Sequence, residues 1–244
     1  MHHIYGIHAV ITALSMRPHQ IKQLFIAQSR DDNKIHQIQQ LAQKANIKIQ
    51  RASKRDLQQY VGEVNHQGVV AMIHAVISYD ETELLTLITE LNHPALLLIL
   101  DGVQDPRNLG ACLRTANASG VDAVIIPKNR ATSITPVVCK VASGAVETTP
   151  IAEVTNLARV MEKLQQQGIW LHGLAEQAVE TIYAADFTGP VALVLGNEGQ
   201  GMRRLTREKC DAIWQIPMCG QVSSLNVAVA TGVSLFEALR QRQA

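Results

Sequence analysis

The chain has 244 residues, of which 47% are apolar and 18% are charged, and its formal net charge is +1; this composition excludes a disordered or uniformly polybasic protein. No apolar run reaches the roughly 18 residues of a membrane-spanning helix, and the start lacks the basic segment of a secretion signal, so we expect a cytoplasmic protein without membrane attachment. The cysteines show no C-x-x-C spacing, which predicts free thiols and no metal site: Cys112, Cys139, Cys210 and Cys219.

The first 75 residues alternate between helical and extended patterns and predict a small α/β domain over residues 1–75. The expected helices cover 7–14, 33–45 and 54–61, and the expected strands cover 23–27, 47–50 and 69–73. This segment has nine Lys and Arg against four Asp and Glu, whereas residues 76–244 have thirteen against seventeen. Such asymmetry favours a polyanion as the partner of the basic half, although basic residues also solubilise small domains.

Residues 76–93 contain several acidic residues and predict a linker with one amphipathic helix. A second α/β domain is expected over residues 94–244, because apolar runs typical of strands buried on both faces alternate there with helical patterns. Its expected strands and helices follow in chain order: strands 95–100, 122–126, 149–152, 169–173, 191–195 and 212–216, with helices 109–118, 136–142, 156–166 and 226–241. The alternation predicts a largely parallel sheet covered by helices on both sides.

Three loops follow strands of this sheet, and ligands of such sheets bind beyond the carboxyl ends of the strands. In the first loop, residues 101–110, Asn108 stands where a helix begins, and Arg114 lies two turns into that helix. A helix N-terminus with an arginine nearby can bind a phosphate or an oxyanion. The alternative is an ordinary N-cap asparagine and a solvated surface arginine.

The second loop, residues 196–202, has three glycines in six residues, which lets the backbone approach a ligand closely. It does not fit the dinucleotide fingerprint, and the chain has no G-x-x-x-x-G-K-[ST] motif. In the third loop, residues 216–230, Ser224 and Asn226 stand where the last helix starts. They can cap that helix or hold a ribose or a substrate hydroxyl.

Together, three motifs resemble the SpoU-type ribose 2′-O-methyltransferases of the SPOUT class. They are NLGACLRTA (108–116), LVLGNEGQG (193–201) and IPMCGQVSSLNVAVATG (216–232). The overall plan is most similar to the branch that methylates a guanosine ribose in the peptidyl-transferase P loop of 23S rRNA. Three positions depart from the family pattern, none of them assigned to chemistry: Cys219, Gln221 and Ala228.

The resemblance implies a deep trefoil knot in the C-terminal part of the catalytic domain, a feature that is otherwise nearly absent from proteins. It also implies an L30e-like RNA-binding domain at the N-terminus. A homodimer is implied as well, with the terminal helix in the interface, and the apolar stripe from Val229 to Phe236 fits this, although it would equally serve an ordinary core. S-adenosylmethionine would bind between the second and third loops. Its implied contacts are Gly196, Ile216 and Leu225, with Asn197, Gly201 and Met218 as neighbours.

The implied reaction transfers a methyl group from S-adenosylmethionine to a ribose 2′-oxygen of 23S rRNA. Arg114 would grip the phosphate of the target nucleotide and polarise the hydroxyl, since a guanidinium is a poor general base. Asn108 and Glu198 would position Arg114 through hydrogen bonds, and Ser224 and Asn226 would hold the ribose or the loop backbone. Two alternatives stay open at this point: the same chemistry on tRNA or another rRNA site, and a non-catalytic RNA-binding protein of ribosome assembly.

Overall fold

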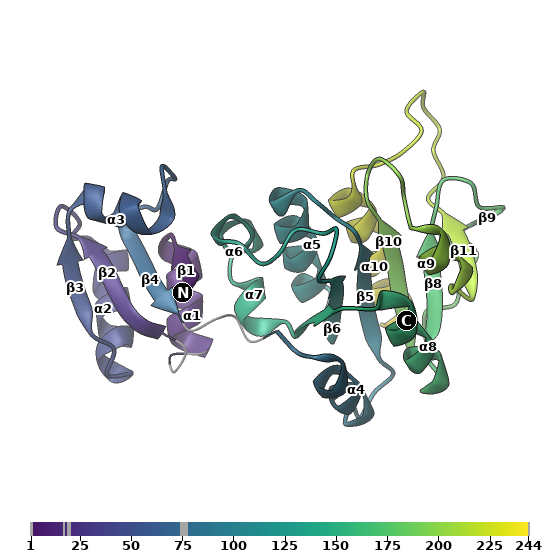
Figure 1. Ribbon diagram of the computed structural model, residues 1–244, viewed down its shortest axis with the longest axis horizontal. Coiled ribbons are helices and arrows are strands. Elements are labelled where there is room, and N and C mark those ends of the chain that lie inside the picture. Colours follow the sequence, from purple (N-terminus) through teal and green to yellow (C-terminus); the bar gives the residue numbers. More distant parts are fainter. Residues whose placement is uncertain (1, 17, 19–20, 74–77, 244) are drawn as a thin grey trace. The chain divides into compact units, whose positions relative to one another are not determined.

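The computed structural model describes residues 2–16, 18, 21–73 and 78–243, which form two compact units (Figure 1). One unit comprises residues 1–77 and 134–148, and the other comprises 78–133 and 149–244. This division differs from the predicted domains in two places. The predicted linker contains helix α4 (Glu81–Thr89), which packs into the core of the second unit. Residues 134–148, expected in the catalytic domain, join the first unit.

The first unit is built on a four-stranded sheet in the order β1-β4-β2-β3, in which β2 and β3 are parallel and the other pairs are antiparallel. Its strands are β1 (His2–Tyr5), β2 (Ile21–Ala27), β3 (Ile49–Ala52) and β4 (Val69–Ile73). Its helices are α1 (Ile7–Met16), α2 (Asn33–Lys44), α3 (Lys54–Val61), α6 (Pro136–Ala142) and α7 (Ala145–Thr148).

Local signals explain where the helices of the first unit begin. The Asp32 carboxylate accepts hydrogen bonds from the first backbone amides of α2, and Ser53 forms a capping box with Asp56 at the start of α3. Helix α6 joins this unit because the Lys140 ammonium donates to the carbonyl of Asn65 at 2.9 Å and lies 5.3 Å from the centre of the Tyr5 ring. The contacts of α6 therefore place it in the first unit, although it lies between strands of the second unit in the chain.

The second unit contains the predicted parallel sheet. Its order is β7-β6-β5-β10-β8-β11-β9, and every neighbouring pair is parallel. The strands are β5 (Leu96–Asp101), β6 (Ala123–Pro127), β7 (Ile151–Val154), β8 (Trp170–Leu174), β9 (Glu180–Thr181), β10 (Val191–Gly196) and β11 (Ala212–Gln215). Besides α4, its helices are α5 (Pro106–Ala118), α8 (Leu157–Gln166), α9 (Arg204–Glu208), α10 (Val227–Arg242) and the short 3-10 helix Ile182–Ala184.

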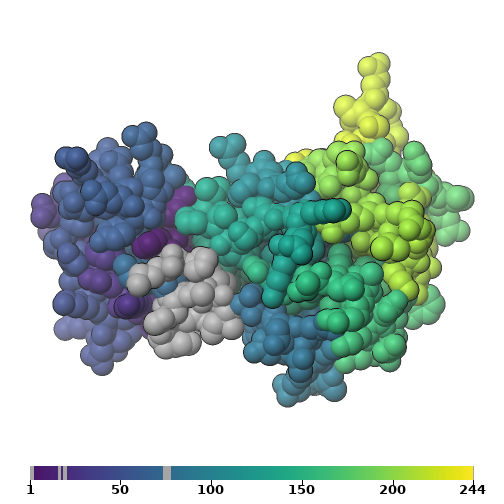
Figure 2. Space-filling model, in the orientation of Figure 1, coloured from purple at the N-terminus to yellow at the C-terminus, as the bar shows by residue number. Residues whose placement is uncertain are grey.

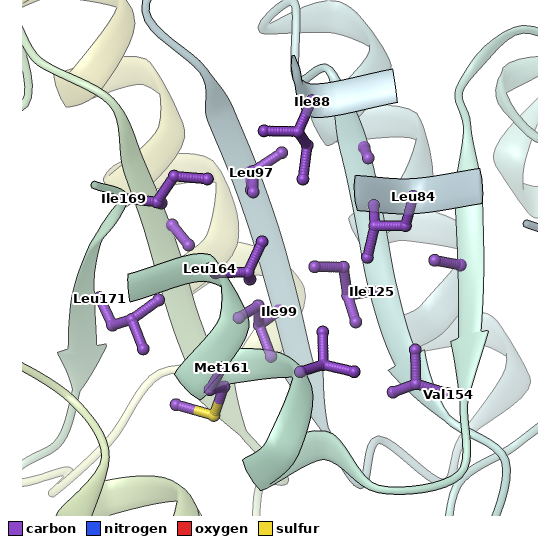
Figure 3. Packing of buried hydrophobic residues seen from close by; sticks show 14 of the residues in the cluster. Leu84, Ile88, Leu97, Ile99, Ile125, Val154, Met161, Leu164, Ile169 and Leu171 are labelled. Carbon is purple, nitrogen blue, oxygen red and sulfur yellow. The ribbon is translucent and has the colours of Figure 1, made fainter. Parts of the chain in front are cut away.

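The core of the second unit lies on both faces of this sheet. On one face, Leu84 of α4 and Leu164 of α8 pack over Leu97, Ile99 and neighbouring strand residues (Figure 3). Side chains alternate along a strand, so the other residues of β5 point to the opposite face, the side on which α10 contacts β10 and packs beside α5. Residues 96–100 of β5 are all buried, as this uninterrupted apolar run predicts, and Asp101 at the end of the strand is buried as well.

No helix in the described ranges is both long and apolar enough to cross a bilayer.

Candidate active site

A cavity of about 450 Å³ lies at the carboxyl ends of β10, β8 and β11 in the second unit. This is the edge at which parallel sheets bind ligands. The three residues predicted to contact the cofactor and the three predicted as their neighbours all line it: Gly196, Ile216 and Leu225, and Asn197, Gly201 and Met218. Glu198 and Ser224, predicted for catalysis, line it as well. Two loops that the sequence separates by thirteen residues, 203–215, therefore form one concave surface.

The glycine-rich loop forms a tight hairpin over the end of β10. The backbone amide of Asn197 donates to the Gly201 carbonyl at 3.2 Å, and the Gly201 amide donates back to the Asn197 carbonyl at 3.0 Å. The Asn197 side-chain oxygen accepts from the amides of Gly199 and Gln200 at 3.0 and 2.7 Å. A Cβ atom at Gly196 would lie 1.9 Å from the carbonyl carbon of Gly201. Only glycine can occupy position 196 in this conformation.

The third loop connects β11 to α10 and projects from the surface of the second unit (Figure 2). Asn226 caps α10, since its side-chain oxygen accepts from the amide of Ala228 at 3.0 Å. Ser224 is exposed and lines the cavity, but it does not cap the helix. The capping interpretation therefore holds for Asn226, while Ser224 is available to a ligand.

Hydrogen bonds connect the three motifs beside the cavity. The Asn108 amide donates to Oε1 of Glu198 in the glycine-rich loop. The Asn226 amide donates to Oδ1 of Asn108 at 3.1 Å. The alternative role of Asn108 as the N-cap of α5 does not hold, because the Asp105 carboxylate caps this helix and Pro106 occupies its first turn. The Asn108 side chain is thereby free to join the other two loops.

Arg114 lies apart from these residues in the single chain. It is exposed on α5 and is not among the residues that line the cavity. It stands six residues after Asn108, so it lies ~9 Å further along the helix and on another face. Within the described part of the chain, no hydrogen bond joins its guanidinium to Asn108 or Glu198, which bond to each other instead.

Four residues that the sequence interpretation did not single out also shape this site. Glu176 and Arg207 bring opposite charges to the cavity lining. Asp101, at the end of β5, accepts a hydrogen bond from the backbone amide of Arg203 just beyond the glycine-rich loop. Asp101 could have been found from the sequence, because a carboxylate directly follows the apolar run of a predicted buried strand. Nothing in the sequence pattern marked the other three.

Two thiols near the site, those of the buried Cys112 and the partly buried Cys210, are unsuited to nucleophilic chemistry. Burial raises the pKa of Cys112 to about 11 and that of Cys210 to about 12. Both therefore stay protonated near neutral pH, and a neutral thiol is a weak nucleophile. The described ranges also contain no cluster of three or more His, Cys, Asp or Glu residues placed to hold a metal ion.

The chain belongs to the SpoU rRNA methylase family, whose model matches residues 95–236. A second model, described as RNA 2′-O ribose methyltransferase substrate binding, matches residues 3–78. The cavity and all three motifs fall within the first match. The basic N-terminal segment falls within the second.

Relatives and solved structures agree with this assignment. The chain is 50% identical over 240 residues to the 23S rRNA (guanosine-2′-O-)-methyltransferase RlmB of Pseudomonas putida, covering 98% of this chain and 96% of the relative. It is also 50% identical to RlmB of Coxiella burnetii, over 99% of this chain and 96% of the relative. The fold is similar to that of AviRb from Streptomyces viridochromogenes in complex with AdoMet, with a TM-score of 0.83 at 24% identity over 99% of this chain and 90% of that one.

Proposed function

We propose that this protein transfers a methyl group from S-adenosylmethionine to the ribose 2′-oxygen of a guanosine in 23S rRNA. Membership of the SpoU family and 50% identity to RlmB proteins over nearly the whole chain support this reaction and this substrate. The observation that carries the proposal is the meeting of Asn108, Glu198 and Asn226, one from each motif, beside a cavity lined by all six predicted cofactor residues.

The cavity fits S-adenosylmethionine in its chemistry. Gly196 and Gly201 expose backbone groups that can approach an adenosine moiety closely. Ile216, Met218 and Leu225 supply apolar surface, and the Glu198 carboxylate lies at the side that faces α5. The bound cofactor supplies an electrophilic methyl group on a sulfonium, whose positive charge a nearby carboxylate stabilises.

The protein has to orient the substrate hydroxyl and stabilise its oxygen as the proton leaves. Orientation can lower such a barrier by roughly 7–11 kcal/mol, and one well-placed electrostatic donor adds about 3–4 kcal/mol. Arg114 is the donor in this proposal: its guanidinium binds the phosphate of the target nucleotide and polarises the 2′-hydroxyl. Asn108 and Glu198 fix α5 against the glycine-rich loop, and Ser224 and Asn226 hold the ribose or the loop backbone.

The protein acts as a homodimer through α10 in this proposal. Val229 and Phe236 on this helix are 52% and 49% exposed, although they belong to the apolar stripe that could have served the core. Exposed apolar side chains on one helix face are typical of an interface. Helix α5 packs beside α10, where Cys112 Sγ lies 3.4 Å from the hydroxyl of Thr231. A dimer through α10 therefore brings Arg114 near the partner chain.

The remaining expectations complete the proposal. The C-terminal segment passes through a loop to form a trefoil knot; the insertion of β10 between β5 and β8 and the convergence of the second and third loops on one cavity support this. Residues 1–75 form an L30e-like domain that binds RNA, which the net positive charge of this segment supports. The second unit, residues 78–133 and 149–244, is the catalytic domain, and the enzyme works in the cytoplasm, where rRNA is made.

Mapping of ribose methylation tests the proposal. We expect 23S rRNA from cells that lack this protein to lose one 2′-O-methylguanosine, detected by mass spectrometry of nuclease fragments. The purified protein with S-adenosylmethionine should restore that methyl group. Restoration of a methyl group in tRNA instead would support the alternative substrate. Failure of the folded protein to bind S-adenosylmethionine would support a non-catalytic assembly factor.

A further inference from the structure

A fully buried carboxylate, Asp101, takes no part in the mechanism above. It ends β5, where the five preceding residues are apolar and buried, and its side chain is 0% exposed. A buried charge destabilises a protein unless other groups pair with it or donate hydrogen bonds to it. The partners of Asp101 therefore indicate its role.

Both oxygens of Asp101 face Arg203. Oδ2 accepts from the Arg203 backbone amide at 2.8 Å, and Oδ1 lies 3.5 Å from Nε of the same residue. The Arg203 guanidinium also donates to the carbonyls of Asn129 and Arg130, at 3.4 and 3.3 Å. Arg203 therefore connects the end of β5 to the segment that follows β6.

Asp101 thereby holds both ends of the glycine-rich loop. Its backbone pairs with Gly196 in the ladder between β5 and β10, which fixes the residue where the loop begins. Its side chain binds the amide of Arg203, the residue directly after Met202, where the loop ends. The hairpin between these two points contains Asn197, Glu198 and Gly201, which line the cofactor cavity.

The neighbouring Gly102 leaves the space that this arrangement needs. Its φ is +84°, in the region that favours glycine. A Cβ atom there would lie 3.1 Å from Nη2 of Arg203 and 3.4 Å from the carbonyl oxygen of Arg130. Asp101 therefore binds Arg203, and the absence of a side chain at Gly102 leaves room for the Arg203 guanidinium.

We infer that Asp101, acting through Arg203, is a positioning residue that holds the glycine-rich loop in the conformation that binds S-adenosylmethionine. Neither residue lines the cavity, so neither touches the cofactor. Their contribution is preorganisation: a loop already fixed at both ends loses less conformational freedom when the ligand binds. The inference rests on the proposed function only in taking S-adenosylmethionine as the ligand.

Calorimetric titration of the full-length protein with S-adenosylhomocysteine tests this inference. Asp101→Asn keeps the size of the side chain and an acceptor for the Arg203 amide but removes the charge. Arg203→Gln keeps the backbone amide but removes the guanidinium. We expect each variant to raise the Kd about tenfold, and the double variant to raise it little further, because both changes break one connected network.

Arg204→Gln is the matched control. Arg204 is the next residue, and its guanidinium pairs with the exposed Glu208 at 2.6 Å, away from Asp101. We expect its Kd to equal that of the wild type. Hydrogen–deuterium exchange should be faster over residues 197–203 in Asp101→Asn and Arg203→Gln, and unchanged in the control. At saturating S-adenosylmethionine, Asp101→Asn and Arg203→Gln should show most of the wild-type kcat, because these changes weaken cofactor binding and leave the reaction step intact.

An unchanged Kd in folded Arg203→Gln would overturn the inference. This side chain is 38% exposed, so the variant keeps the test decisive even if Asp101→Asn does not fold. Wild-type protein that binds neither S-adenosylhomocysteine nor S-adenosylmethionine would instead contradict the proposed function. The two failures are therefore distinguishable in one set of titrations.

Discussion

At the scale of single residues, the contacts of Asn108 in the folded chain determine its role in the first motif. Asn108 stands at the start of a helix, where asparagine most often acts as an N-cap. Asp105 takes that role, because Pro106 supplies the first helical residue and lacks an amide proton. The Asn108 amide can then donate to Glu198 and accept from Asn226. A capping residue in the sequence becomes the link between three loops in the structure.

Two substitutions of Asn108 should distinguish the effect of losing its hydrogen bonds from the effect of adding a negative charge. Asn108→Ala removes both connecting hydrogen bonds, the one to Glu198 and the one from Asn226, so we expect kcat/KM for an rRNA fragment to fall roughly tenfold. Asn108→Asp should be worse, because its carboxylate would face that of Glu198, and neighbouring like charges destabilise each other. Lower pH should restore part of the Asn108→Asp activity, since protonation of one carboxyl group removes the repulsion. Equal activity of the two variants at all pH values would contradict this.

Arg114 should matter for the rate and not for cofactor binding. We expect Arg114→Ala and Arg114→Lys to lower kcat by about 10²–10³, the range for loss of one oxyanion donor. Lysine keeps the charge but lacks the planar fork that binds a phosphate through two hydrogen bonds. The Kd for S-adenosylhomocysteine should stay unchanged, because Arg114 lies outside the cavity lining. Full activity of Arg114→Lys in a methyl-transfer assay would refute its assignment.

At the scale of elements, segments with a clear apolar pattern were predictable, whereas a strand too short to show such a pattern was not. The strand expected at 191–195 is β10, and the helix expected at 54–61 is α3. Strand β9 has only the two residues Glu180 and Thr181, too few to show any alternation. It exists because it pairs with β11 at the sheet edge. Pairing with a distant strand, rather than local pattern, creates such an element.

The side chain of Arg242 holds the C-terminal end of helix α10 in place. The Arg242 guanidinium donates to the carbonyls of Phe187, Pro94, Ala95 and Gly189 at 2.6–2.9 Å. Arg242→Ala would leave partly buried carbonyls without donors, so we expect it to lower the free energy of unfolding by about 2–3 kcal/mol. Arg242→Lys should recover only part of this, because an ammonium cannot reach all four acceptors. Urea denaturation checks both values, and wild-type stability of Arg242→Ala would contradict them.

At the scale of the whole molecule, the proposed homodimer makes a sharp prediction about Arg114. Mixed dimers can be made from an Arg114→Ala chain and a Leu225→Trp chain, whose cofactor cavity the tryptophan would fill. If Arg114 serves the cavity of the partner chain, each mixed dimer keeps one complete site. We expect this arrangement, because Arg114 lies outside the lining of its own cavity while α5 packs beside the exposed helix α10.

The measurement is methyl transfer by the mixed dimers relative to each inactive parent. Recovery of activity on mixing is the expected outcome. No recovery, with mixed dimers present by native mass spectrometry, would mean that Arg114 serves the cavity of its own chain. Wild-type chains mixed with the Leu225→Trp chain provide the control for dimer exchange.

The sequence by itself determined the alternating elements, the parallel sheet and the three motifs, because these patterns depend on residues that are close together in the chain. The family resemblance carried by those motifs assigned six residues to the cofactor, and all six are among the residues that line the cavity. Only the tertiary structure decided that Asn108 bonds to Glu198, 90 residues away, and that Asp101 binds Arg203, 102 residues away. These contacts arise because β10 lies between β5 and β8 in the sheet, and strand order is set by packing over the whole unit rather than by any local pattern.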